Sequence, residues 1–292
     1  MRAQLIKLLL KVFAALPLWA AHACGAALGM LLAVLPNSLR RIAAINLAAC
    51  FPELDAPARR RLLRRNLIET GKTLAEMGAM WYWPMPRLLS TMRAVSGMDS
   101  VDAAQRRGRG VILASPHLGA WEMAGLYVSV RFPMTSLYRP PRLRALEQLS
   151  RTARARFGAR LVPTDASGVR ALYQALGRGE VLGILPDQNP EPGSGVFAPF
   201  FGMPAYTMVL IARLARKTGA ALFVAYAERL PHSQGYHLRF REAPAEFATA
   251  TPEQAAAIMN HLIETCVREQ PAQYQWNYKR FRIQPEGRSS LY

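Results

Sequence analysis

The 292-residue chain is long enough to bury one large core or two modest ones, and 51% of its residues are hydrophobic, which argues against intrinsic disorder. Its 37 lysine and arginine residues outnumber 19 acidic residues, so the formal net charge is +18. Such a charge attracts anionic partners, such as nucleic acid, an anionic membrane or an acidic carrier protein. The three cysteines are widely spaced, which supports neither a disulfide framework nor a zinc site.

The N-terminal part of the sequence contains a long uncharged segment. Residues 12–36 include no Asp, Glu, Lys or Arg, and this length exceeds the roughly 20 residues that a helix needs to cross a bilayer. We therefore expect a membrane anchor over residues 1–37, with the body of the chain on the cytoplasmic side because the arginines that follow are numerous. Two alternatives are a cleaved signal peptide and a helix that lies in the membrane interface, which Pro17 would allow.

The rest of the sequence predicts helices first and then a mixed pattern. Two helices are expected between residues 38 and 80, with a break at residues 51–54 and Asp55 as the cap of the second. From residue 110, short apolar runs alternate with helical stretches. The expected strands are 111–114, 134–137, 181–185 and 221–226, and the expected helices lie near 121–130, 143–157, 168–177, 205–216 and 252–268.

This alternation predicts an α/β fold with a mostly parallel central sheet flanked by helices. On this basis the chain divides into the anchor, a helical lead-in over residues 38–100 and an α/β core over residues 101–292.

One histidine and one glutamate stand at a favoured place for a site. In α/β folds, ligands bind beyond the carboxyl ends of parallel strands, and His117 follows the expected strand 111–114. Glu122 comes five residues later, so the two side chains meet only if His117 lies in the turn before the helix, where Gly119 provides backbone freedom. A carboxylate that binds one imidazole nitrogen makes the other a better general base for an alcohol. The alternative is a histidine bonded only to the backbone.

His117 and Glu122 in this setting resemble the H-x-x-x-x-(D/E) motif of glycerolipid acyltransferases. Other parts of the chain resemble one branch, the bacterial lipid A biosynthesis acyltransferases, which include lauroyl and myristoyl transferases. The matching blocks follow in that family's order and are Asn46-Leu47 to Cys50-Phe51-Pro52, Tyr138-Arg139-Pro140, Pro186-Asp187-Gln188, Phe197 to Phe200-Phe201-Gly202, and Tyr274 to Phe281. The resemblance covers almost the whole chain.

The resemblance implies an O-acyltransferase whose domain spans residues 38–292. It would move a fatty acyl group from an acyl carrier protein thioester to a hydroxyl of a lipid A precursor, late in lipopolysaccharide biosynthesis. His117 would then be the base and Glu122 its orienting partner, while Arg139 or Arg154 would hold an anionic group or stabilise the oxyanion. The further candidates for substrate binding are Asp187, Gln188, Phe201, Gly202 and Thr207.

The partners follow from the same resemblance. Seven arginines between Arg139 and Arg160 are opposed by Glu147 alone, which suits either an acidic carrier protein or a solvated helix face. We expect the bacterial inner membrane as the location, with no cofactor, no metal and no nucleic acid partner. Coenzyme A as donor, another acceptor such as a lysophospholipid or aminolipid, and a non-catalytic basic protein that binds membrane or nucleic acid remain as alternatives.

Overall fold

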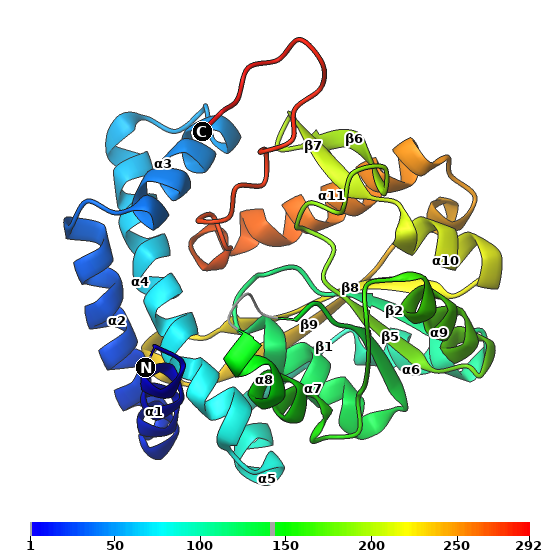
Figure 1. Ribbon diagram of the computed structural model, residues 1–292, viewed down its shortest axis with the longest axis horizontal. Coiled ribbons are helices and arrows are strands. Elements are labelled where there is room, and N and C mark those ends of the chain that lie inside the picture. The colour runs from blue at the N-terminus through cyan, green and yellow to red at the C-terminus, as the bar shows by residue number, and fades with distance from the viewer. Residues whose placement is uncertain (1, 141–143) are drawn as a thin grey trace.

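The computed structural model describes residues 2–140 and 144–292. Within them, the largest sheet has seven strands in the order β1-β9-β8-β2-β5-β3-β4 (Figure 1). All neighbouring strands are parallel except β8 and β9, which are antiparallel. The mostly parallel sheet predicted from the sequence is therefore confirmed. The strand bounds are β1 Met92–Ser96, β2 Val111–Ala114, β3 Met134–Leu137, β4 Arg160–Val162, β5 Val181–Ile184, β8 Ala221–Arg229 and β9 Tyr236–Glu242.

Helices cover both faces of this sheet (Figure 1). In β2, Ile112 and Ala114 join one buried apolar cluster, while Val111 and Leu113 join the other. This two-sided burial explains why the central strands read as continuous apolar runs. The first cluster includes α3 (Ser38–Cys50), α9 (Ala166–Gly177), α10 (Leu210–Thr218) and α11 (Pro252–Glu269), and the second includes the end of α4 (Ala56–Tyr82), α5 (Met85–Leu89), α6 (Met98–Arg106) and α7 (Trp121–Arg131).

Most predicted elements are confirmed, but the strands β1, β4 and β9 were not predicted, β1 lies within the expected helical lead-in, and one expected helix is wrong in part. Asp55 caps α4 by accepting a hydrogen bond from the Ala58 N–H at 2.6 Å, as expected. The helix expected over residues 205–216 is wrong in its first part, because β7 (Met203–Met208) pairs there with β6 (Gly195–Phe200) in a separate antiparallel hairpin. The helix expected near residues 143–157 is shorter and consists of a 3₁₀ turn, η1 (Arg144–Leu146), followed by α8 (Glu147–Ala155).

The N-terminal segment forms two helices rather than one. α1 (Arg2–Ala15) ends before Pro17, and α2 (Leu18–Val34) begins after it. The single segment expected over residues 12–36 is therefore not found as one helix. Among the described residues, no single helix combines the length and apolarity of a membrane span, although α2 and α3 reach them together as a pair bent by 78°.

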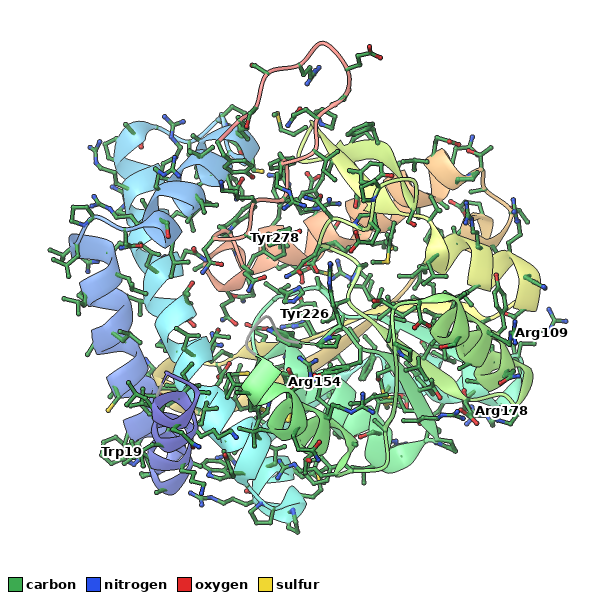
Figure 2. The ribbon with its side chains drawn as sticks, in the orientation of Figure 1. Trp19, Arg109, Arg154, Arg178, Tyr226 and Tyr278 are labelled. Carbon is green, nitrogen blue, oxygen red and sulfur yellow. The ribbon has the colours of Figure 1, made fainter. Side chains whose placement is uncertain are left out.

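Both N-terminal helices pack against α4. The approach of α2 is especially close, because a Cβ atom added to Gly71 would lie only 2.0 Å from the Gly25 carbonyl oxygen. The outward side of the two helices is apolar. Ten of the fourteen exposed large hydrophobic side chains in the described part of the chain lie between residues 5 and 35, and Trp19 is the second most exposed of them at 67% (Figure 2). We call these ten the N-terminal apolar face: Leu5, Leu8, Leu9, Val12, Trp19, Leu28, Met30, Leu31, Val34 and Leu35.

Candidate active site

His117 lies in the turn that connects β2 to α7, at the carboxyl end of β2. The main chain holds this turn on both sides, since the Ser115 N–H donates to the Ile184 oxygen and Gly119 bridges to Ala227 of β8. Gly119 has φ of 61°, and an added Cβ atom would lie 2.1 Å from the Ala227 oxygen. Only glycine fits there, so the expected backbone freedom at Gly119 is confirmed.

Asp187, the third residue after the end of β5, holds the His117 ring. Its Oδ1 lies 2.8 Å from His117 Nδ1, and its Oδ2 accepts a hydrogen bond from the His117 N–H at 2.8 Å. Burial raises the pKa of the Asp187 carboxyl, but His117 outweighs this effect through its charge and hydrogen bonds, so the pKa lies below its ordinary value. A carboxylate accepts only, so Nδ1 carries the proton and Nε2 keeps the free lone pair.

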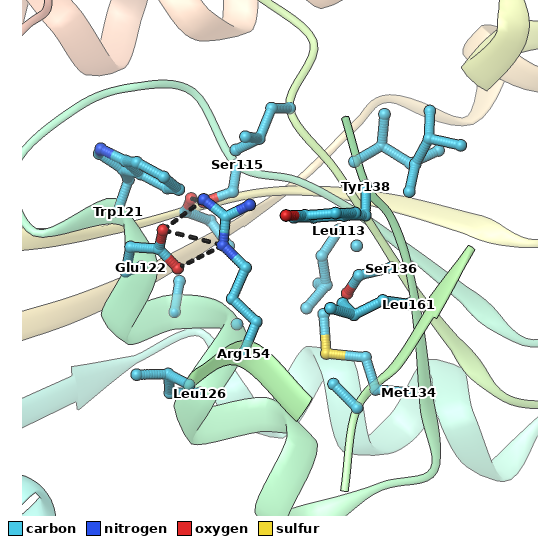
Figure 3. Close-up of a pocket in the computed structure, with 18 residues that line it drawn as sticks. Leu113, Ser115, Trp121, Glu122, Leu126, Met134, Ser136, Tyr138, Arg154 and Leu161 are labelled. Atoms are coloured by element: carbon cyan, nitrogen blue, oxygen red, sulfur yellow. Dashed lines mark hydrogen bonds and ion pairs between the residues drawn. The ribbon is translucent and has the colours of Figure 1, made fainter. Parts of the chain in front are cut away.

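Glu122 does not orient His117, which corrects the pairing expected from the sequence. Its carboxylate instead binds Arg154 of α8, with Nε at 3.0 Å from Oε1 and 3.1 Å from Oε2, and Nη2 at 2.5 Å from Oε1 (Figure 3). The physical reason is that Glu122 lies in the first turn of α7, where its side chain reaches the Arg154 guanidinium, while Asp187 already occupies Nδ1 of His117.

The Arg154 side chain is 25% exposed and lies toward the interior of the molecule, whereas Arg109 and Arg178 project from its edge (Figure 2). Burial lowers the pKa of the Arg154 guanidinium, but the charge and hydrogen bonds of Glu122 raise the pKa above its ordinary value. The guanidinium carbon lies 5.4 Å from the ring centroid of Trp121, and this ring is 4.9 Å from the His117 ring. Trp121, which no sequence pattern singled out, therefore contacts both polar groups of the site.

A cavity opens beside the Glu122–Arg154 pair, between the sheet and helices α7 and α8 (Figure 3). Its volume is about 650 Å³, including the open mouth. Ser115, Glu122, Tyr138 and Arg154 provide polar groups, and most of the remaining lining is apolar. A pocket of this size and composition suits an elongated apolar ligand with one polar end. The deeper lining includes Leu113, Leu126, Met134, Leu137, Leu161 and Ile184.

Gln188 and Gln275 complete the surroundings of His117. The side-chain nitrogen of Gln188 lies 3.2 Å from His117 Nε2 and 3.2 Å from the Gln275 side-chain oxygen. The Gln275 N–H also donates to the His117 carbonyl oxygen at 3.0 Å. Sequence reasoning placed Gln188 among the site residues but gave Gln275 no role, because its contact depends on a C-terminal segment that folds back over the turn.

The other candidates lie elsewhere. Arg139 is exposed and donates to Glu191 at 2.6 Å. Phe201 packs in the core beside Phe51 and Trp276, Gly202 lies in the β6–β7 turn, and the Thr207 hydroxyl accepts a hydrogen bond from Arg280. None of these four lines the cavity; of the site residues expected from the sequence, Glu122 and Arg154 line it, while His117, Asp187 and Gln188 lie outside its lining. Part of the arginine-rich stretch, residues 141–143, lies outside the described residues.

Comparison with known proteins assigns the chain to a family. The model of the bacterial lipid A biosynthesis acyltransferase family matches residues 3–283. The chain belongs to this family. It is 31% identical to a lipid A biosynthesis lauroyltransferase of Escherichia coli K12 over 95% of this chain and 90% of the relative, and 32% identical to a palmitoleoyltransferase of the same strain over 86% and 81%. The myristoyltransferase of that strain is 26% identical over 91% and 84%. The sequence implied an acyltransferase of this family, and the comparison confirms this enzyme class.

Proposed function

We propose that this acyltransferase moves a fatty acyl group from an acyl carrier protein thioester to a hydroxyl of a lipid A precursor, with His117 as the general base. The observation that carries the proposal is the His117–Asp187 pair at the carboxyl end of β2, next to Trp121, which packs on the His117 ring and also lines the mostly apolar cavity. The names of the relatives support an acyl donor and a lipid A acceptor.

In the proposed reaction, Nε2 of His117 takes the proton from the acceptor hydroxyl as its oxygen attacks the thioester carbonyl carbon. Asp187 keeps Nδ1 protonated and stabilises the imidazolium that forms. The tetrahedral intermediate then collapses, the carbon–sulfur bond breaks, and the proton on Nε2 passes to the departing thiolate. The products are an ester of the lipid and a free carrier thiol, so atoms and charge balance.

Arg154 is the residue best placed to meet an anionic group at the cavity mouth. Glu122 fixes its Nε and Nη2, whereas Nη1 makes no hydrogen bond within the described residues. A fixed cation of this kind stabilises an oxyanion without reorganising during the reaction. Glu122 thus acts by holding Arg154 rather than by touching His117. The acyl chain of the donor would occupy the apolar part of the cavity.

The donor and the location are part of the same proposal. Arg139, Arg151 and Arg160 are exposed near the ends of β3 and β4 and on α8, which suits docking of an acidic carrier protein. Arg156 is not free for such docking, because its guanidinium donates a hydrogen bond to the Met80 carbonyl oxygen at 2.6 Å. The enzyme would work on the cytoplasmic side of the inner membrane, where the N-terminal apolar face meets lipid.

The test is transfer by the purified enzyme from an acyl carrier protein thioester to an under-acylated lipid A acceptor, followed by mass spectrometry. We expect one acyl-chain mass on the acceptor, and its loss by a factor on the order of 100 to 10,000 in His117→Ala. Parallel reactions with acyl coenzyme A and with lysophospholipid acceptors compare the alternatives. Normal turnover by folded His117→Ala protein would refute the mechanism.

A further inference from the structure

The base nitrogen of His117 already has a partner in the structure. Because Asp187 holds the protonated Nδ1, Nε2 offers only a lone pair, and the Gln188 amide nitrogen faces it at 3.2 Å. The opposite amide orientation would place the Gln188 oxygen against this lone pair, so that two acceptors would face each other. The hydrogen-bond pattern therefore requires Gln188 to donate to His117.

The same amide group uses its second hydrogen on Gln275. That side-chain oxygen lies 3.2 Å from the Gln188 nitrogen, and the Gln275 N–H is fixed to the His117 carbonyl oxygen. The chain on either side of Gln188 is also fixed, since Asp187 is 3% exposed and bound to His117, and the Asn189 N–H donates to the Tyr278 hydroxyl at 3.0 Å. Both neighbours hold the Gln188 backbone, so its side chain is directed at the base.

We propose that Gln188 masks the lone pair of the base until an acceptor hydroxyl displaces it, and so favours a lipid hydroxyl over water. This inference rests on the proposed function, in which His117 is the base. A water molecule that reaches Nε2 would give up a proton there, attack the thioester and release a free fatty acid and the carrier thiol. That side reaction wastes the acyl donor.

The preference for a lipid hydroxyl over water comes from the binding energy that each acceptor has available to displace the Gln188 amide. A hydrogen bond contributes about 1 kcal/mol net, so opening the mask slows any acceptor by roughly fivefold unless other contacts offset it. A lipid acceptor has contacts remote from its hydroxyl, and their binding energy offsets the cost. Water has none, so the mask discriminates against hydrolysis specifically. Gln188 is in this sense a specificity-determining residue.

The test replaces Gln188 by methionine, which has a similar length and no amide donor. With an acyl carrier protein thioester and no acceptor, we expect Gln188→Met to release free fatty acid about fivefold faster than the unaltered enzyme. With acceptor present, the ratio of hydrolysis to transfer should rise by a similar factor. Gln275→Met, which removes only the second bond of the Gln188 amide, should give a smaller rise.

Two further measurements separate this inference from a structural role and from the proposed function. Adding His117→Ala to Gln188→Met should abolish the extra hydrolysis, because the exposed base drives it. A parallel fall of hydrolysis and transfer in Gln188→Met, or an unchanged ratio, would overturn the mask while transfer by the unaltered enzyme still supports the proposed function. If His117→Ala alone transfers normally, the proposed function fails and the mask fails with it.

Discussion

Asp187 and Glu122 are buried carboxylates near His117, yet each binds a different partner. Asp187 contacts both the ring and the N–H of His117, so it fixes the tautomer and the position of the base at once. Glu122 contacts Arg154 through both of its oxygens. In the proposed mechanism, Asp187 therefore serves the group that moves the proton, and Glu122 serves the group that meets negative charge.

Asp187→Asn should reduce kcat by a factor on the order of 100 to 10,000, because the amide no longer requires Nδ1 to carry the proton. The measurement is steady-state transfer, together with a thermal unfolding curve. The control is Asp165→Asn, which alters the exposed cap of α9. This control should leave kcat unchanged. Equal loss of kcat in the two variants would contradict the role of Asp187.

One methionine in the cavity lining is placed to limit the length of the acyl chain. Met134 lines the cavity, and its terminal methyl fills the space beside Gly183, where an added Cβ atom would lie only 2.4 Å from it. Met134→Ala should therefore admit a longer acyl chain, measured by competition between donors of different length. Met98→Ala, in the apolar cluster but outside the cavity lining, is the control. Met98→Ala should lower the free energy of unfolding without changing the length of acyl chain that the enzyme accepts.

The sequence predicted the members of the site better than their contacts. His117 and Asp187 each follow the carboxyl end of a parallel strand, as the sequence predicted, and the structure brings them into contact, with Gln188 beside them and Arg154 bound to Glu122. The His117–Glu122 pairing failed because a five-residue spacing across an irregular turn does not determine where either side chain points. Phe201 and Thr207 were placed by the order of blocks alone, and such order does not separate cavity lining from core.

Four elements meet at one buried polar cluster. Glu76 of α4 accepts hydrogen bonds from Arg229 of β8, with Nη2 at 2.5 Å and Nε at 3.0 Å, and from the Tyr236 hydroxyl of β9 at 2.9 Å. His22 of α2 lies 3.2 Å from the same carboxylate. This cluster joins α2 to the α/β core, in addition to the close glycine contact with α4.

Glu76→Gln should lower the free energy of unfolding by up to about 3 to 5 kcal/mol near pH 7, because it removes the buried carboxylate that binds Arg229 and leaves the guanidinium paired with Glu69 alone among the described residues. Burial raises the pKa of Glu76, but Arg229 and His22 outweigh it and lower the pKa from 4.5 to about 2. Because folding lowers the pKa of Glu76, its ionised carboxylate contributes fully to the free energy of unfolding above about pH 4.5. This contribution is lost as the pH falls toward 2.

Denaturant unfolding at several pH values in detergent measures this difference. The difference in free energy of unfolding between the unaltered enzyme and Glu76→Gln should become smaller as the pH falls from 5 to 2. Glu53→Gln is the control, since Glu53 is exposed and lies 3.5 Å from Arg268. It should change stability little. A gap that stays constant with pH would show that the carboxylate charge is not what stabilises the cluster.

The errors in element prediction have a physical cause as well. β9 places Tyr236, Leu238 and Phe240 on its buried side, so a period of two was present in the sequence and was missed. β7 was assigned to a helix because its apolar residues continue into α10 without an obvious break. The strands buried on both faces were predicted correctly, because continuous apolar runs between turn residues are a strong pattern.

The N-terminal helices connect the apolar surface of the molecule to the site. α1 contacts η1, which leads into α8, the helix that carries Arg154. The N-terminal apolar face therefore adjoins the elements that form the cavity. Lys11 of α1 and Arg41 of α3 are exposed, and anionic headgroups would attract both. If this face binds the membrane, as proposed, a lipid acceptor would approach the cavity from the side of α1.

Replacing Leu31, Val34 and Leu35 together by asparagine tests this arrangement. Their side chains are 50% to 68% exposed in the structure, so the change should not disturb the fold. If they insert into lipid, each loses about 1.5 to 3 kcal/mol of apolar burial when replaced. We expect the unaltered enzyme to stay with membranes after a high-salt wash, because salt screens charge but not apolar insertion, and the triple variant to be released.

The matched control changes Leu74, Val95 and Val130 to asparagine, which are exposed apolar residues on α4, β1 and α7. This control should remain in the membrane fraction after the same wash. Equal release of both triple variants would show that general surface hydrophobicity, rather than the N-terminal apolar face, determines binding. Complete release of the unaltered enzyme by salt alone would exclude insertion of this face and leave the arginine-rich surface as the sole membrane contact.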